Sequence, residues 1–328
     1  MVTKLLKRTA FLIAIPFLIW TGYWSAFSYL IEHGLSLASQ NTPSSKPTVQ
    51  FEVAAVTGYP QNFSVGITDV EFGTKDSVTW ATPQVFFEAK SYLPNKVNLD
   101  LSQPHSISGA IGSLEIDARI ANLIFLFQPN MQLSLGRLDA LFEDVSFSFE
   151  GQLTTNINRV FARVEASPND DNTYLLNANI ENFDLSNLIV DLPGGYQYIQ
   201  NLSFKADVLL TRPLDRFVID NYAPALQKLL LQKAQITYGT TSISLDGTLA
   251  YNTAGTLDGN LNVTVQEWKS LFELAKGLGY VEADLEEFFY SILLDLAKQD
   301  ESENSLKIPL IIRNNNIIFG ALTLGFLP

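Results

Sequence analysis

Apolar and polar residues alternate along most of the chain after residue 48. The alternation holds over runs of five or more residues, which is typical of a β-strand with one buried face. These apolar residues mark the runs: Phe51 and Val53; Phe63, Val65 and Ile67; Leu114, Ile116, Ala118 and Ile120; Met131, Leu133 and Leu135; Val145, Phe147 and Phe149; Tyr174, Leu176, Ala178 and Ile180; Leu202, Phe204, Ala206, Val208 and Leu210; Leu306, Ile308, Leu310 and Ile312; Ile318, Leu322, Leu324 and Phe326. Short spacing between runs favours antiparallel pairing, because a parallel crossover needs about a dozen residues.

Other stretches repeat apolar residues every three or four positions, as a helix that packs on a sheet does. One such stretch is 220–232. Another is 266–298, where Gly277 and Gly279 divide the pattern into two helices. The sequence therefore predicts a mainly β protein with α (α+β), in which helices from the C-terminal half cover part of a large, curved antiparallel sheet.

The tripeptide Leu-Asp-Gly occurs twice, and the turn at 252–256 lies between the copies. The two runs predict a hairpin in which Gly247 and Gly259 occupy the buried parity. A strand glycine there marks a bulge, a bend or the close approach of another element. The aspartates before them then face water and do not lie opposite each other, which argues against a shared metal site. We interpret the repeat as a device that curves the sheet, with Trp268 starting a helix that packs on it.

The N-terminal segment 9–31 is uncharged and follows a basic tail that contains Lys4, Lys7 and Arg8. As a helix it would extend about 34 Å, enough to cross a hydrocarbon core of about 30 Å. Basic residues on the near side predict a cytoplasmic N-terminus, and the Trp and Tyr residues in the second half suit the far interface. We expect a cytoplasmic tail at 1–8, a transmembrane helix at 9–31, a linker at 32–48 and a periplasmic β-rich domain at 49–328.

A cleaved signal peptide is the alternative interpretation of this segment. Its apolar core would be about 7–15 residues long and would be followed by small residues. Here the apolar run is longer, and the small residues at 37–39 come late. In either case the bulk of the chain leaves the cytoplasm, and a bacterial inner membrane is the expected location.

The composition of the chain limits the kinds of binding site and catalytic site that it can form. The chain has no cysteine and a net charge of −13, which excludes disulfides and thiolate metal sites and argues against nucleic acid as a partner. Its two histidines are His33 and His105, and the latter is either a catalytic residue or a surface-loop residue. Asp170 and Asp171 fit a turn tip better than a calcium loop. The sequence therefore predicts no catalytic residue, no metal ligand and no cofactor.

Several short stretches carry a resemblance to a known family. They are the pair Tyr23-Trp24, the tripeptide Gly58-Tyr59-Pro60, the run 236–272 and the C-terminal run 308–328. Together they resemble the domain of unknown function 2125 family, found mainly in alphaproteobacteria. The chain departs from the family in having Tyr59 where Phe is frequent, and in lacking a Gly-rich segment before the strand at Ile236. The resemblance implies structural roles for the tripeptide but no established activity.

The strand pattern is also similar to that of AsmA-like envelope proteins, whose long curved sheets are associated with lipid handling. Two strand faces are the candidates for such a role here. They are Val145, Phe147 and Phe149 on one strand, and Phe204, Val208 and Leu210 on another. These residues are either sheet core or the lining of a groove for an acyl chain. An apolar strip that the helices leave uncovered would need a ligand, a membrane or a partner.

We therefore expect a non-enzymatic, membrane-anchored envelope protein that has a structural role or binds lipid or another apolar ligand. The first alternative is a scaffold that recruits another envelope protein through an edge strand. A hydrolase that uses dispersed carboxylates is the second alternative.

Overall fold

The computed structural model describes residues 2–40, 48–53, 55–73, 78–189, 192–193, 195–219, 223–298, 303–320 and 322–327. The chain is mostly antiparallel β-sheet with a few helices, so the predicted fold class is confirmed. It divides into two compact units. One contains residues 1–126 and 148–151, and the other contains residues 127–147 and 152–328.

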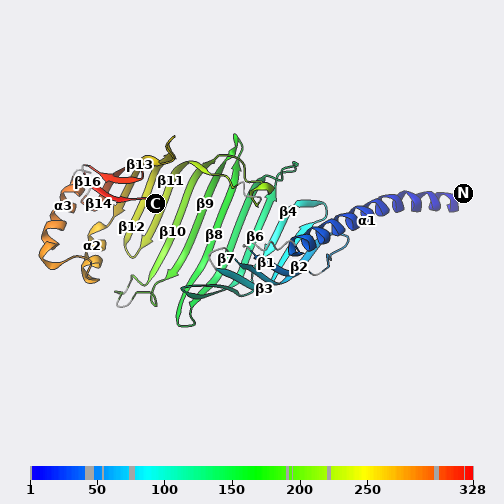
Figure 1. Ribbon diagram of the computed structural model, residues 1–328, viewed down its shortest axis with the longest axis horizontal. Helices are drawn as coiled ribbons and strands as arrows, with labels where there is room; N and C mark the ends of the chain where they lie inside the picture. The colour runs from blue at the N-terminus through cyan, green and yellow to red at the C-terminus, as the bar shows by residue number, and fades with distance from the viewer. Residues whose placement is uncertain are drawn as a thin grey trace. The chain divides into compact units, whose positions relative to one another are not determined.

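The first unit combines a long helix with a sheet. Its elements are α1 (Val2–Gln40), β1 (Thr48–Val53), β2 (Asn62–Gly73), β3 (Thr79–Lys90), β4 (Leu93–Asp100), β5 (His105–Gly109) and β6 (Gly112–Phe127). The strand order is β1-β2-β3-β4-β6, and β5 pairs with β3 and β6. All of these pairs are antiparallel. Figure 1 shows α1 in dark blue, with its last turns beside these strands.

Helix α1 contains the stretch Ala14–Leu37, whose 24 residues are long and apolar enough to cross a membrane. The helix runs past the predicted boundary at residue 31 and ends at Gln40, so the first part of the predicted linker is helical. Residues 41–47 lie outside the described part of the chain. One face of α1 from Trp20 to Leu35 packs on the sheet, so the second half of the predicted membrane segment also contacts protein.

The second unit is a sheet whose strands follow one another in sequence order. Its strands are β7 (Leu135–Phe149), β8 (Leu153–Ser167), β9 (Asp170–Asp184), β10 (Tyr198–Leu210), β11 (Leu226–Tyr238), β12 (Thr241–Tyr251), β13 (Leu257–Gln266), β14 (Ser305–Arg313), β15 (Asn316–Phe319) and β16 (Leu322–Phe326). Its helices are η1 (Arg216–Ile219), α2 (Trp268–Gly277), η2 (Ala283–Leu285) and α3 (Glu286–Lys298). In Figure 1, α2 and α3 lie in orange beside the last strands.

The helix predicted at 220–232 is wrong. Leu226 begins strand β11, and residues 220–222 lie outside the described part of the chain. The cause is a strand with apolar residues on both faces. Leu229 and Leu231 lie on one face, where they pair with Leu249 and Gly247 of β12, whereas Leu230 lies on the other face and is 41% exposed. A run of this kind imitates helical spacing.

The strand predicted to begin at Met131 is also wrong. Met131 is almost fully exposed, and Leu133 has a positive φ of 50°, which a strand does not accommodate. The side-chain oxygen of Asn130 accepts a hydrogen bond from the Ser134 N–H instead, so these residues form a turn. Strand β7 begins only at Leu135.

The doubled Leu-Asp-Gly forms the predicted hairpin. Gly247 pairs with Leu261 and Gly259 pairs with Leu249, so the two Asp-Gly steps are not opposite each other, as predicted. Of the three predicted reasons for the glycines, close approach holds directly. A Cβ at Gly247 would lie 2.1 Å from the Asn260 carbonyl oxygen, and one at Gly259 would lie 2.0 Å from the Thr248 carbonyl oxygen. A bulge occurs as well, in β11 opposite this region, where the register shifts between Leu231 and Ala234.

The core of the second unit forms where α2 and α3 pack on β13 and β14. Trp268 begins α2, as predicted, and is 2% exposed. Its cluster includes Val265, Phe272, Ala297 and Leu306. The Trp268 indole N–H donates to the Glu303 carbonyl oxygen at 3.1 Å, so the ring is fixed by its polar end as well as by packing.

Candidate apolar binding surfaces

The strands β8 to β14 place apolar residues in register on one face of the sheet. Four rows of paired residues, one from each strand in order, make up this face: Val160, Ile180, Leu202, Ile236, Ile243, Val265 and Leu306; Ala162, Ala178, Phe204, Ala234, Leu245, Val263 and Ile308; Val164, Leu176, Ala206, Leu231, Gly247, Leu261 and Leu310; Ala166, Tyr174, Val208, Leu229, Leu249, Gly259 and Ile312. We call this surface the apolar face.

The opposite face of the same strands is mostly polar. Its clearest row pairs Arg159, Glu181, Asn201, Thr237, Ser242, Gln266 and Ser305 across the same seven strands. Arg163 pairs with Asp139 of β7 on this side. Because the side-chain period of a strand is two, this contrast fixes which side of the sheet avoids water.

Helices cover the apolar face over the later strands. The cluster that α2 and α3 form includes Val265 and Leu306, and Ile243 and Val263 pack against it. Over β8 to β11, as over much of β12 to β14, most residues of the face are half-buried, and none of the described residues there belongs to the cluster that the helices form. Tyr174, Ala206 and Leu231 are the buried members of the four rows there. This section measures roughly 14 Å across three strand spacings and about 20 Å along each strand.

One end of the half-buried section is closed by the connection between β10 and β11. The Leu214 backbone N–H donates to the Tyr174 hydroxyl at 2.8 Å, and the Leu214 carbonyl accepts from the Leu135 N–H at 2.7 Å. Tyr174 is 1% exposed, and burial raises the pKa of its hydroxyl. The hydroxyl therefore stays neutral, which suits an apolar surrounding.

The predicted groove residues divide between two separated strands. Phe204 and Val208 lie in rows of the apolar face, and Leu210 follows them on β10. Val145, which is buried, lies with half-buried Phe147 on β7, and β8 and β9 separate β7 from β10. Phe149 belongs to the first unit, where its ring would block a side chain at Gly112.

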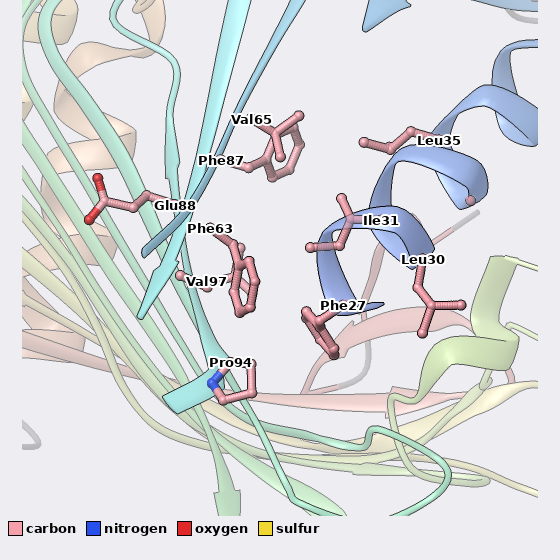
Figure 2. Close-up of a pocket in the computed structure, with 12 residues that line it drawn as sticks. Phe27, Leu30, Ile31, Leu35, Phe63, Val65, Phe87, Glu88, Pro94 and Val97 are labelled. Atoms are coloured by element: carbon pink, nitrogen blue, oxygen red, sulfur yellow. The ribbon is translucent and has the colours of Figure 1, made fainter. Parts of the chain in front are cut away.

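A second apolar surface lies in the first unit, between α1 and strands β2 to β4. It is a pocket of about 430 Å³ lined by Phe27, Leu30, Ile31, Gly34, Leu35, Phe63, Val65, Phe87, Glu88, Ala89, Pro94 and Val97. Figure 2 shows the α1 side chains on one side and those of the strands on the other. The carboxylate of Glu88 points away from α1, so the side chains between helix and strands are apolar. We call this cavity the α1 pocket.

Polar contacts hold α1 beside this pocket. The Trp20 and Trp24 indole N–H groups donate to the carbonyl oxygens of Pro60 and Asn62 at 3.0 and 2.9 Å. The Tyr23 hydroxyl donates to the Ser91 carbonyl oxygen at 2.9 Å. The spacing of these donors puts them on one helix face with Phe27, Ile31 and Leu35, which pack around Phe63.

The tripeptide Gly58-Tyr59-Pro60 forms the turn beneath this contact. Gly58 has a φ of 96°, and a Cβ there would lie 2.9 Å from the Asn62 carbonyl oxygen, so the turn requires glycine. The Tyr59 hydroxyl is 2.7 Å from the Thr21 hydroxyl, and its ring packs edge-on against Trp24. The turn therefore contacts α1 directly and positions it.

The candidate catalytic groups do not assemble. His105 is half-buried at the start of β5, stacked on Trp80, so the surface-loop interpretation is wrong. Its Nε2 contacts the Leu101 carbonyl oxygen at 2.8 Å, and its Nδ1 is buried without a hydrogen-bond partner in the described part of the chain. A triad histidine instead has a carboxylate on this atom. The described residues contain no cluster of His, Asp and Glu suited to a metal ion.

Asp170 begins β9 directly after the turn at 168–169 and pairs with Ser167, so it flanks the hairpin tip on which it was predicted. Its carboxylate accepts hydrogen bonds from the Asn172 N–H and the Thr173 hydroxyl at 3.1 and 2.7 Å. The Thr173 hydrogen bond, and after it that of Asn172, lowers the pKa of this carboxyl. These contacts build an Asx turn and use the oxygens that a calcium ion would need.

The sequence analysis missed the α1 pocket. Its lining on the helix repeats at Phe27, Ile31 and Leu35, which is the spacing of a helix that packs on protein. That spacing was visible in the sequence. However, a membrane segment is apolar on every side, so its sequence does not indicate which face packs on a sheet. Phe87, Pro94 and Val97 belong to strands that the alternation pattern did not single out.

The fold and these surfaces define a β-rich protein with an apolar N-terminal helix and two apolar surfaces outside its helix-covered core. A family described as an uncharacterized protein conserved in bacteria (DUF2125) matches residues 24–328, and the chain belongs to this family. The match begins at Trp24, within the section of α1 that packs on the sheet. No curated protein and no solved structure matches the chain.

Proposed function

We propose that this protein is a non-enzymatic, single-pass protein of the bacterial inner membrane that binds a lipid or another apolar ligand on the apolar face. Its N-terminus lies in the cytoplasm and its β-rich part in the periplasm. The basic residues before the apolar helix support this orientation, because positive charge is retained on the cytoplasmic side.

One observation carries the proposal. The four apolar rows continue without a polar interruption from β14 to β8, whereas the helix-covered cluster is built on β12 to β14. A half-buried apolar strip of this size exceeds what scattered surface residues produce, and such strips mark binding surfaces. Apolar rows whose one hydroxyl belongs to Tyr174 suit an acyl chain better than a polar substrate.

Native mass spectrometry of the full chain, extracted in a mild detergent, tests this proposal. We expect lipid to remain bound to the wild-type protein. Leu176 and Leu175 offer a matched pair, since they are neighbours on β9 and face opposite sides of the sheet. Leu176→Glu should lower the number of lipids bound per chain relative to wild type, because it places a charge on the apolar face. Leu175→Glu should leave that number unchanged, because Leu175 is already 38% exposed on the polar side.

A thermal melt of each variant separates loss of binding from loss of folding. If Leu176→Glu does not fold, Ala162→Leu serves instead, because it adds volume to the same face without a charge. The proposal is wrong if wild-type protein carries no lipid, or if a folded variant of either kind keeps as much lipid as Leu175→Glu.

A second candidate function is recruitment of a protein partner at strand β16. In the strand order this strand pairs with β15 and ends the sheet. Its residues Leu322, Leu324 and Phe326 are 64%, 58% and 66% exposed. An exposed apolar edge strand is a template for pairing with another chain. The test compares what co-purifies with wild type and with Leu324→Lys. This role is favoured if the variant loses a partner protein that wild type retains, while its lipid content is unchanged.

A further inference from the structure

The part of α1 between its basic residues and its first contact with the sheet in the described part of the chain is too short to cross a bilayer alone. Eleven residues, 9–19, separate Arg8 from Trp20, where contact with the sheet begins. They extend about 16 Å as a helix, roughly half of a hydrocarbon core of about 30 Å. If the core begins near Thr9, it ends about 20 residues later, near Tyr29. The first part of the section that contacts the sheet, from Trp20 to about Tyr29, therefore lies at the level of the leaflet on the β-rich side.

The hydrogen bonds between α1 and the sheet are of the kind expected within a membrane leaflet. Backbone carbonyls in a membrane must find donors within the protein, because the lipid offers none. The carbonyls of Pro60, Asn62 and Ser91 receive hydrogen bonds from the aromatic side chains of α1. Ser91 is 1% exposed, and its hydroxyl donates to the Pro60 carbonyl as well. The ends of β2 and β3 are thus satisfied internally where they contact the helix.

The α1 pocket begins where the helix leaves this level. Its helical wall runs from Phe27 to Leu35, and Leu30 at its border is 63% exposed. Its volume of about 430 Å³ falls in the range of ligand pockets, which is about 300–1,000 Å³. Because α1 is both the wall of the pocket and the membrane helix, an acyl chain can reach the cavity along the helix without crossing water.

We propose that the α1 pocket receives one acyl chain of a phospholipid from the leaflet that surrounds α1. The inference rests on the membrane anchorage in the proposed function, and it adds a second binding site, in the other unit of the chain. The polar headgroup remains outside, because the side chains between helix and strands offer it no partner.

Two glycines of α1 provide a matched pair of variants. Gly34 lines the pocket, and a Cβ there would meet no atom within 4 Å. Gly22 lies in the same helix, also has open space at its Cβ, and is not part of the pocket lining. Gly34→Phe therefore fills the cavity without backbone strain. Gly22→Phe makes the same chemical change elsewhere on the helix.

The experiment uses the full chain in vesicles of phosphatidylethanolamine and phosphatidylglycerol that contain a trace of phosphatidylcholine with a diazirine near its acyl terminus. After irradiation, mass spectrometry of peptides locates the label. We expect label on Phe87 and Val97, which face α1 from β3 and β4. Gly34→Phe should reduce this label about tenfold, the equivalent of about 1.4 kcal/mol in binding. Gly22→Phe should leave it unchanged.

The pattern of label separates this inference from the proposed function. Label on β9 and β10 without label on Phe87 and Val97 overturns the pocket and leaves the apolar face as the binding surface. Label on the pocket alone supports the inference and contradicts binding on the apolar face. Equal pocket label in both glycine variants also overturns the inference. An absence of label on the exposed residues Phe17 and Leu18 contradicts membrane anchorage, and with it both proposals.

Discussion

The carboxylate of Asp258 ties together two hairpin turns that are far apart in the sequence. Its Oδ1 accepts a hydrogen bond from the Asn314 backbone N–H at 2.8 Å, and its Oδ2 accepts one from the Asn252 side-chain amide at 2.9 Å. Asn252 belongs to the β12–β13 turn, and Asn314 belongs to the β14–β15 turn. The second copy of Leu-Asp-Gly therefore has a structural role that the first copy lacks, because Asp246 is exposed and bonds to Asn262.

These hydrogen bonds make the second unit sensitive to acid. They lower the pKa of Asp258 below its ordinary value of 3.8, and the Asn314 N–H has the largest effect. A carboxyl whose pKa is lower in the folded state stabilises the fold above its unfolded pKa. The contribution is lost as pH falls through the folded pKa. We expect Asp258→Asn to lower the melting temperature at neutral pH, with a difference from wild type that shrinks as pH falls below the unfolded pKa and is lost below the folded pKa.

Thermal melts of the full chain in detergent at a series of pH values measure this difference. Asp246→Asn is the matched control, since it makes the same change in the first copy of the motif, and its melting temperature should stay near that of wild type. A difference for Asp258→Asn that persists unchanged at the lowest pH would contradict the role of the ionised carboxylate.

The glycines of the repeat should not tolerate a side chain. At Gly247 a Cβ would meet the Asn260 carbonyl oxygen at 2.1 Å, and the residue has a φ of 147°, which favours glycine. We expect Gly247→Val to destabilise the second unit by roughly 3 kcal/mol or more, measured by denaturant unfolding. Gly325→Val is the control, because Gly325 lies in a strand with no atom within 4 Å of its Cβ position. Equal stability of the two variants would argue against the close approach.

This hairpin also shows how far the sequence predicts the structure. The alternation and the turn at 252–256 predict the pairing of Gly247 with Leu261, because a strand period of two and a short turn leave one register. The contact of Asp258 with Asn314 could not be predicted in this way. It depends on β14 lying beside β13 after an insertion of two helices, and no local pattern encodes that return.

The candidate sites were predictable to a similar degree. Phe204 and Val208 follow from alternation within one strand, and the structure places them in rows of the apolar face. The extent of that face depends on the registers of seven strands, and one bulge in β11 shifts the pattern at Leu231. The α1 pocket could not be predicted from hydropathy alone. Hydropathy identifies a helix of membrane type, but it does not show that the helix also packs on β2 and β3.

Removal of the Trp268 ring should open the core of the second unit. The side chain is 2% exposed, lies 5.4 Å from the Tyr290 ring and fills the space between α2, α3 and β13. We expect Trp268→Ala to cost about 3–5 kcal/mol in the free energy of unfolding, because it leaves a cavity and removes a hydrogen bond. Denaturant unfolding followed by circular dichroism measures the loss. Phe288→Ala on the exposed side of α3 should change stability by about 0.5 kcal/mol or less.

The indole N–H of Trp24 should control how firmly α1 holds to the sheet. It donates to the Asn62 carbonyl oxygen at 2.9 Å, while its ring stacks on Phe63 with centroids 5.6 Å apart. Trp24→Phe keeps an aromatic ring but leaves that carbonyl without this donor, at a cost of about 1 kcal/mol. We expect amide hydrogen exchange at the start of β2 and the end of β3 to speed up about fivefold. Tyr29→Phe, on the outward face of α1, should leave the exchange rates unchanged. If exchange is also unchanged in Trp24→Phe and Trp24→Ala, the contact between α1 and the sheet does not protect these strands.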